Sequence, residues 1–140
     1  MKFFVFLALF VLQTSININR LVAQDTIAIQ FFIRGIYKLN YNRDTLGALE
    51  DFNKSIDIDP TGVNSIFNRG LLYACNKQYR LALLDFDKGI ELYPNMANLY
   101  GNRGNVRALL SDIAGAIEDY KRAAQLQPKD PLPYLNIGNL

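Results

Sequence analysis

A period of 34 residues runs through most of the chain and constrains its fold more than any other feature. Five residue types recur at this step, namely Gly70, Gly104 and Gly138; Pro60, Pro94 and Pro128; Ala48, Ala82 and Ala116; Asp51, Asp85 and Asp119; Phe52, Phe86 and Tyr120. Five registers with one period indicate repeated structural units. Gly35 precedes Gly70 by 35 residues, so we expect one extra residue in the first unit, in a turn at 40–43.

Each unit has the pattern of two helices. Apolar residues recur at helical spacing, as in Leu46, Leu49, Phe52 and Ile56, which predicts amphipathic helices. A unit of this length cannot bury its apolar face alone, so neighbouring units must stack. A glycine inside a helix costs about 0.5–1 kcal/mol relative to alanine, so a repeated mid-helix glycine predicts close helix–helix contact. We expect helices at 26–40, 44–57, 62–76, 79–91, 96–110, 113–126 and 131–140.

These residues resemble the tetratricopeptide-repeat (TPR) family, whose pattern places Leu-Gly, Tyr, A-x3-F and Pro at a 34-residue period. The chain departs from the pattern at Arg34, Arg69 and Arg103, where leucine is usual, and at Lys38 and Arg107, where tyrosine is usual. The resemblance implies an all-α fold, a right-handed α-solenoid of TPR helical hairpins. We expect a domain at 25–140, with full repeats near 27–60, 61–94 and 95–128 and the first helix of a fourth at 129–140.

The first 24 residues have the pattern of a secretory signal peptide. Lys2 supplies a positive start, Phe3–Leu12 is an apolar run, and polar residues follow. An apolar helix of this length reaches only ~15 Å, about half the span of a bilayer. We predict cleavage near Ala23, with a cut after Ser15 as the alternative, and export to the periplasm or the medium. A buried helix in a cytosolic protein is the other interpretation. The style of the repeats, rich in Asn and Ile, is similar to that of bacterial TPR proteins.

Composition excludes several classes of function. Fifteen Lys+Arg less Lys2 and Arg20 leaves thirteen, against thirteen Asp+Glu, so residues 25–140 are neutral. A neutral chain has no general electrostatic attraction to nucleic acid or to anionic lipid. The chain has no histidine and one cysteine, Cys75, which removes the commonest general base and any multi-cysteine zinc site or internal disulfide. We therefore predict no catalysis, no cofactor and no metal.

The resemblance implies that the first helix of each hairpin lines a concave surface that binds a protein or peptide. The residues expected to contact the partner are Phe32, Ile36, Asn64, Phe67, Asn68, Leu71, Asn98, Asn102, Asn105 and Asn136. Three asparagines, 68, 102 and 136, form a ladder at the 34-residue step. An amide both donates and accepts, so it can pair with the backbone of an extended peptide. Alternatively, these asparagines bond to the adjacent hairpin.

Lysine is absent from the offsets at which some TPR domains clamp a C-terminal carboxylate, so an adaptor of that kind is not expected. The three arginines before the glycines allow two interpretations, an anion-binding stripe or ion pairs with the repeated aspartates. We expect ion pairs, Arg34 with Asp51, Arg69 with Asp85 and Arg103 with Asp119, each within about 4 Å.

Together these patterns predict a non-catalytic protein–protein interaction scaffold. The alternative is a truncated piece or a structural protomer of a larger TPR array. The predicted last helix carries five apolar side chains, too many for a solvated cap, at Leu132, Tyr134, Leu135, Ile137 and Leu140. An exposed apolar patch marks an interface, so self-association through this C-terminal helix is a further expectation.

Overall fold

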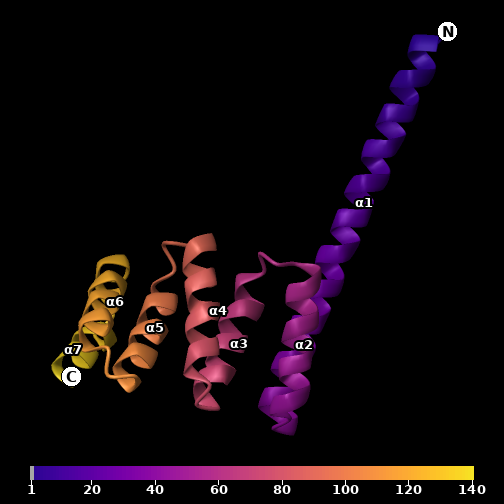
Figure 1. Ribbon diagram of the computed structural model, residues 1–140. Coiled ribbons are helices and arrows are strands. Elements are labelled where there is room, and N and C mark those ends of the chain that lie inside the picture. The colour runs from indigo at the N-terminus through magenta and orange to yellow at the C-terminus, as the bar shows by residue number, and fades with distance from the viewer. Residues whose placement is uncertain (1) are drawn as a thin grey trace.

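The computed structural model describes the backbone of residues 2–140 and the side chains of residues 13–140. Every described element is helical, and the helices stand in a row in chain order (Figure 1). The elements are α1 (Lys2–Tyr37), the π-helical turn η1 (Lys38–Asn42), α2 (Thr45–Ile58), α3 (Val63–Cys75), α4 (Tyr79–Leu92), α5 (Ala97–Leu109), α6 (Ile113–Leu126) and α7 (Leu132–Gly138). The predicted all-α solenoid is confirmed.

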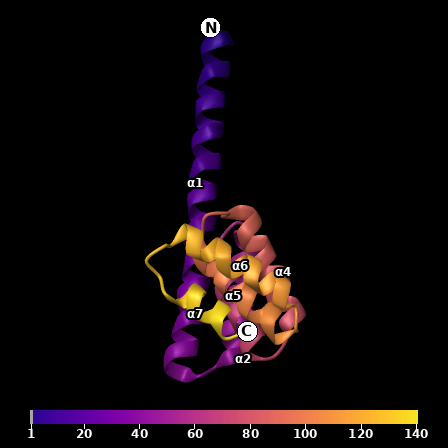
Figure 2. The same cartoon turned by 90° about the vertical axis from the view of Figure 1, so that its left-hand side faces the viewer.

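The helices pair as three hairpins, α1 with α2, α3 with α4 and α5 with α6, and α7 packs on α6 as a single helix. Figure 2 shows the stack from the end at which α6 and α7 lie, with α1 extending far beyond it. Six of the seven predicted helices agree with the observed bounds to within a few residues. The prediction for the first helix, which placed its start at 26, is wrong, because α1 begins at Lys2. No glycine or proline precedes Gly35, so nothing in the sequence stops the helix.

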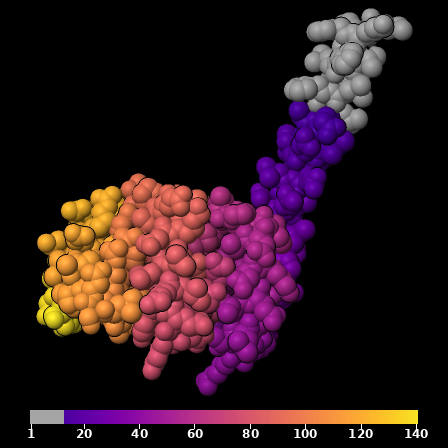
Figure 3. All heavy atoms as spheres, viewed as in Figure 1, coloured from indigo at the N-terminus to yellow at the C-terminus, as the bar shows by residue number. Residues whose placement is uncertain are grey.

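The N-terminal part of α1 stands away from the stack (Figure 3). From Gln13 to Ile27 every side chain except Thr14 is exposed, and Ala28 is the first buried residue. Residues 13–24 therefore contribute no burial to the repeats. The apolar run at 3–12 lies outside the described side chains.

The extra residue of the first unit lies in η1, as expected. A π-helical turn holds one more residue than an α-helical turn, and Arg43, the residue that follows η1, has a φ of 53°. Lys77 and Ser111 have φ values of 58° and 65° at the corresponding turns of the next two hairpins. Arg43 lies eight residues after Gly35, whereas Lys77 and Ser111 lie seven residues after their glycines. The register of the three hairpins is thus restored before α2 begins.

The apolar core is shared between successive hairpins rather than enclosed in each one. Phe86 of α4 lies in one buried cluster with Leu99 and Val106 of α5, and Phe67 of α3 packs against it. Phe52 of α2 lies in a second cluster with Leu72 of α3. Each hairpin therefore depends on its neighbour for burial, as expected of a solenoid.

The glycines of the three complete hairpins allow close helix contact, which confirms the reason predicted for them. A Cβ atom on Gly35 would lie 2.7 Å from the ring of Phe52, one on Gly70 would lie 2.9 Å from the ring of Phe86, and one on Gly104 would lie 2.8 Å from the ring of Tyr120. No side chain fits at these distances without displacing the ring. The aromatic residue of each second helix thus fixes the approach of the first.

All three predicted ion pairs are present, and each is bidentate. The guanidinium of Arg34 binds both carboxylate oxygens of Asp51. Arg69 donates to Asp85 at 2.9 and 2.6 Å, and Arg103 donates to Asp119 at 2.9 and 2.6 Å. The aspartates are at most 5% exposed, so these are buried carboxylates held by fork-shaped donors. The anion-binding stripe is excluded for these arginines.

Two of the aspartates bind a second cation. Lys38 lies 3.0 Å from Asp51, and Arg107 lies 3.0 Å from Asp119. Lys38 and Arg107 are the residues that stand where the TPR pattern has tyrosine, and in the second hairpin Tyr73 keeps the usual residue. The departures from the pattern at these positions therefore act together with the arginines to neutralise a buried carboxylate.

Two arginines also bridge to the preceding hairpin. Arg69 donates to Asn53 of α2 at 2.8 Å, and Arg103 donates to Asp87 of α4 at 2.6 Å. Asn53 and Asp87 occupy the same position of their units. Each of these arginines thus joins three helices, two from its own hairpin and one from the hairpin before.

The environment of Asp51 makes the fold sensitive to acid. Its hydrogen bonds with Arg34, and secondarily with Lys38, hold the pKa of this carboxyl below its usual value, although burial opposes the shift. A carboxyl whose pKa is lowered by folding stabilises the fold above its unfolded pKa, near 4. That stabilisation is lost as the pH falls through the lower folded pKa.

We predict that Asp51→Asn lowers the free energy of unfolding by about 1–3 kcal/mol at pH 7, because Arg34 and Lys38 lose their shared anion. The difference from the unsubstituted chain should shrink as the pH falls below about 4. Urea titrations at pH 7 and at a series of acidic pH values measure both quantities. Glu50→Gln removes a neighbouring exposed carboxylate and should change neither; an equal effect of the two substitutions would contradict the assignment.

The second helices differ in their N-terminal caps. Asp44 accepts a hydrogen bond from Gly47 N at 2.9 Å at the start of α2, and Asp112 accepts one from Gly115 N at 3.0 Å at the start of α6. Gln78 occupies the corresponding position before α4, with similar backbone angles and no side-chain cap. The amide of Leu81 bonds only to the main-chain oxygen of Gln78.

We predict that Gln78→Asp stabilises the fold by about 1 kcal/mol, because a cap of this type contributes about that amount. Thermal unfolding followed by circular dichroism measures the change. Gln78→Glu adds the same charge with a side chain that is too long to cap, so it should recover only a small part of the gain. A gain of equal size for both variants would assign the effect to charge rather than to capping.

Candidate functional site

The first helices of the hairpins carry no cation free to bind an anionic ligand within the described repeats. Arg34, Arg69, Arg103 and Arg107 are each held by a buried aspartate, and Lys38 bonds to Asp51 and to the main-chain oxygen of Gly47. α7 contains no lysine or arginine. The face formed by α1, α3, α5 and α7 therefore offers apolar groups and amides instead of positive charge.

The apolar members of the predicted site lie at its N-terminal end and are half-buried. Phe32 and Ile36 of α1 pack against the cluster around Phe52, and Phe67 and Leu71 of α3 pack against the cluster around Phe86. The ring centroids of Phe32 and Phe52, and those of Phe67 and Phe86, are 6.1 Å apart. These four side chains belong to the core as much as to the surface.

Asn68 and Asn102 occupy equivalent positions on α3 and α5 and make equivalent contacts. The side-chain nitrogen of Asn68 donates to the main-chain oxygen of Asn64 at 2.8 Å, and that of Asn102 donates to the main-chain oxygen of Asn98 at 2.8 Å. This bond to the preceding turn fixes the amide and leaves its oxygen as an acceptor toward the surface. Neither asparagine bonds to an adjacent hairpin.

Asn136, the third asparagine of the ladder, makes a different contact from Asn68 and Asn102, because it bonds to Asn105. The side-chain oxygen of Asn105 accepts from the hydroxyl of Tyr120 at 2.8 Å and from the side-chain nitrogen of Asn136 at 3.2 Å. This small network joins α5, α6 and α7. Burial raises the pKa of the Tyr120 hydroxyl, so the hydroxyl remains a hydrogen-bond donor at neutral pH. For Asn136 the alternative of a bond to the adjacent hairpin holds.

Four predicted site residues line one hollow between α5, α6 and α7. They are Asn98, Asn102 and Asn105 of α5 and Asn136 of α7. The remaining wall includes Gly101, Ala123, Gln127 and Pro133, and Asp130 is the one charged residue in the lining. Asp130 accepts a hydrogen bond from Leu132 N at 3.0 Å. The hollow thus presents several amides and a single carboxylate. Asn64, Asn68 and the apolar members do not line it.

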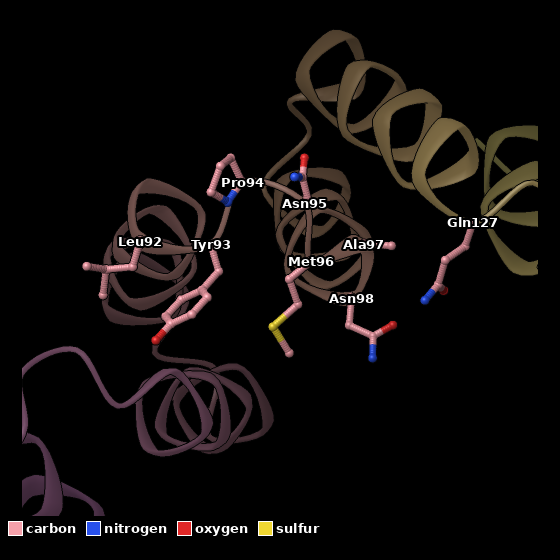
Figure 4. A pocket seen from close by; sticks show the side chains of 8 residues that line it. All are labelled: Leu92, Tyr93, Pro94, Asn95, Met96, Ala97, Asn98 and Gln127. Carbon is pink, nitrogen blue, oxygen red and sulfur yellow. The ribbon is translucent and has the colours of Figure 1, made fainter. Parts of the chain in front are cut away.

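A second hollow adjoins the first through Ala97, Asn98 and Gln127, which line both. In Figure 4 the side chains of Tyr93, Met96, Asn98 and Gln127 extend toward the same side, whereas Leu92 and Asn95 point elsewhere. The hydroxyl of Tyr93 donates to the main-chain oxygen of Thr61 at 3.2 Å, which fixes the ring beside the flexible Met96. An apolar hollow thus continues into an amide-lined one.

The sequence analysis did not find Tyr93, Met96 or Gln127. These residues lie at or beyond the ends of helices, where helical periodicity does not indicate the direction in which a side chain points. A signal was available in Pro94, which marks the turn that brings Tyr93 and Met96 beside Asn98. Across the described residues no three or more His, Cys, Asp or Glu side chains gather in a way that could hold a metal ion. No helix in the described part of the chain is long and apolar enough to cross a membrane.

Comparison with known proteins supports the resemblance drawn from the repeats. A family model described as a TPR repeat matches residues 104–140. The structure is similar to the first TPR domain of Spaghetti (RPAP3) bound to the HSP90 peptide SRMEEVD, with 22% identity and a TM-score of 0.78 over 82% of this chain and 90% of that one. It is also similar to the second TPR domain of human RPAP3 in complex with the HSP70 peptide SGPTIEEVD, with 21% identity and a TM-score of 0.77 over 83% and 96%.

The Arabidopsis OM64 TPR domain is a third similar structure, with 16% identity and a TM-score of 0.78 over 83% of this chain and 95% of that one. No curated protein sequence matches the chain significantly. At these identities the structural likeness shows the fold, and the family model adds the sequence of one repeat. The findings therefore show a TPR repeat in residues 104–140 and, in the described structure, the helical-hairpin fold of TPR domains.

Proposed function

We propose that this chain is a non-catalytic scaffold that binds an extended segment of a partner protein along α5 and α7. The observation that carries the proposal is the continuity of the two hollows around Asn98 and Gln127. An extended peptide has unpaired backbone donors and acceptors, which side-chain amides can satisfy. The hollow beside Tyr93 and Met96 would receive one apolar side chain, for which methionine supplies an adaptable wall.

The charge of the site argues against an acidic ligand. The TPR domains of RPAP3 are solved with peptides that end in EEVD. In this chain every cation on the first helices of the described repeats is already paired, and the hollow contains Asp130 as its single charge. A peptide rich in Asp and Glu would meet a carboxylate and no free cation. We therefore propose a partner segment that is neutral or basic and carries a large apolar residue.

We predict that a random peptide library panned on the full chain enriches sequences with an aromatic or aliphatic residue and few acids. The peptide SRMEEVD should not bind measurably. Asn102→Ala should weaken binding of an enriched peptide about tenfold, since one hydrogen bond to the ligand is worth about 1 kcal/mol or slightly more. Fluorescence anisotropy measures both affinities.

Asn76→Ala provides the matched control, because Asn76 is exposed at the end of α3 and lines neither hollow. It should leave the affinity unchanged. Enrichment of peptides with acidic termini, or equal loss of affinity for the two asparagine variants, would contradict a groove that recognises the peptide backbone through amides. Circular dichroism on each variant verifies that the helices are intact.

We further propose that residues 1–24 act as an export signal and are absent from the working protein, which would be periplasmic or secreted. The exposed segment from Gln13 onward contributes nothing to the core until Ala28, so its removal leaves the repeats complete.

We predict that a chain lacking residues 1–24 unfolds at the same temperature as the full chain, because residues 13–24, the part of this segment whose side chains are described, contain no buried residue. In an exporting bacterial host, mass spectrometry of the exported fraction should find a protein that begins near Gln24. A full-length, uncleaved chain that stays in the cytosol of such a host would contradict the proposal. Asp25→Asn, just beyond the proposed cut, is the control for handling and should change neither result.

A second candidate function is association through α7. Leu132, Tyr134 and Leu135 are between 56% and 60% exposed, which favours an interface at this end of the stack.

A further inference from the structure

The hollow between α5, α6 and α7 is open because α5 lacks a side chain that the earlier first helices carry. Gly101 stands where α1 has Phe32 and α3 has Phe67, and both phenylalanines pack against buried clusters. In the described structure nothing lies within 4 Å of the Cβ position of Gly101, and this glycine lines the hollow. A larger residue at this position would occupy the space that the hollow leaves free.

Helix packing does not require a glycine at this position. A Cβ atom on Gly35, Gly70 or Gly104 would lie 2.7 to 2.9 Å from an aromatic ring, whereas no ring of the described structure approaches Gly101 in this way. Glycine inside a helix is less stable than alanine, so α5 carries a destabilising residue without a packing reason. This observation indicates that the open space itself has a use.

Two amides in the lining of the hollow are fixed with their oxygens free. The side-chain nitrogen of Asn102 donates to the main-chain oxygen of Asn98 at 2.8 Å, and that of Asn136 donates to the side-chain oxygen of Asn105 at 3.2 Å. Each nitrogen is thereby held against the protein, while the side-chain oxygens of Asn102 and Asn136 make no hydrogen bond within the described residues. The hollow therefore offers hydrogen-bond acceptors from two of its walls, α5 and α7.

Asp130 gives the hollow a negative charge. One of its carboxylate oxygens accepts from Leu132 N at 3.0 Å, and the side chain forms no ion pair within the described residues. Among the described residues that line the hollow, none is a lysine or an arginine. Lys129, the residue before Asp130, is exposed and lies outside the lining. A half-buried carboxylate without a cation in the same hollow favours a cationic ligand.

We propose that this hollow binds the guanidinium of an arginine side chain. The inference rests on the proposed function and deepens it, since it names the residue of the partner segment that enters the hollow beside the one that receives an apolar side chain. A guanidinium has five N–H donors in one plane and no acceptor, so it suits acceptors that lie on α5, on α7 and in the turn between α6 and α7. It is also less strongly hydrated than an ammonium group.

The size and the apolar part of the hollow agree with this ligand. Its volume is about 150 Å³, which is enough for the head group of one side chain. Ala123 and Pro133 line it and are themselves buried, so they present an apolar surface to the flat side of a guanidinium. All of these walls belong to elements that the structure describes.

The test titrates the full, isotope-labelled chain with the amide of Nα-acetyl-arginine and follows the side-chain amide signals by NMR. The compound should shift the signals of Asn102 and Asn136 with a dissociation constant in the millimolar range. The corresponding citrulline compound, which has the same shape without the charge, should bind at least about tenfold more weakly. Equal binding of the citrulline compound would overturn the proposal, and tighter binding of the corresponding lysine compound would overturn the assignment to a guanidinium.

Gly101→Phe restores the residue of the first two hairpins and should abolish binding of the arginine compound, because the ring fills the hollow. Gly101→Ala should weaken binding and raise the unfolding temperature, since alanine favours the helix. Gly138→Ala is the matched control, because Gly138 is also open and lies outside the lining; it should leave the affinity unchanged. Full binding by the Gly101→Phe variant would overturn the proposal.

Asp130→Asn removes the charge and keeps an oxygen that can accept from Leu132 N, so the fold should be retained. It should weaken binding of the arginine compound at least about tenfold and leave that of the citrulline compound unchanged. Asp59→Asn is the matched control, because Asp59 also precedes a proline and accepts from Thr61 N at 3.0 Å, but lines neither hollow. Equal effects of the two substitutions would contradict the assignment.

The arginine titration and the selection of peptides can fail separately. Binding of the arginine compound without enrichment of any peptide would overturn the extended partner segment and support the assignment of the hollow. Enriched peptides that keep their affinity when each arginine is replaced by citrulline would overturn the assignment of the hollow and leave the proposed function in place.

Discussion

The bidentate pair between an arginine of the first helix and a buried aspartate of the second is the interaction on which the other features depend. The aspartate is almost without solvent contact, so it can be ionised only because a guanidinium meets it with two hydrogen bonds. The aromatic residue that follows each aspartate sits on the glycine that follows each arginine. The ion pair and the ring contact therefore hold the same turn of the first helix against the same turn of the second helix. The ion pair does so through charge and the ring contact through shape.

This arrangement also determines the character of the surface. The arginines that hold the hairpins together are no longer available to a ligand, and neither are Lys38 and Arg107, which share the same aspartates. A stack of this fold can present positive charge in its groove only from other positions, and the described part of this chain has none there. The polarity of the face instead changes along the stack, from phenylalanines that pack into the core near α1 and α3 to asparagines around α5 and α7.

Much of the fold could be predicted from the sequence because the period places equivalent residues in equivalent environments. The ion pairs followed from Arg and Asp recurring at one step, and the turn with the extra residue followed from the spacing of Gly35 and Gly70. The start of α1 was predicted wrongly, because the residues before 26 were interpreted as a separate segment although no glycine or proline there would end a helix. The site was predicted only in part: the hydrogen bond between Asn105 and Asn136 depends on how α7 is placed against α5, and Met96 lies in a turn that periodicity does not describe.

The hydrogen bonds between neighbouring hairpins restrict the order in which the units can follow one another. Arg69 donates a hydrogen bond to Asn53 and Arg103 donates one to Asp87, each on the helix before it. The residue one 34-residue step after Asp87 is Lys121. A duplicated copy of the second or third unit placed after α6 would bring its arginine against this lysine, and two like charges at that distance repel. The three units are thus not interchangeable modules despite their common period. The fourth unit has Ile137 at the position of these arginines, so it places no like charge in register with Lys121.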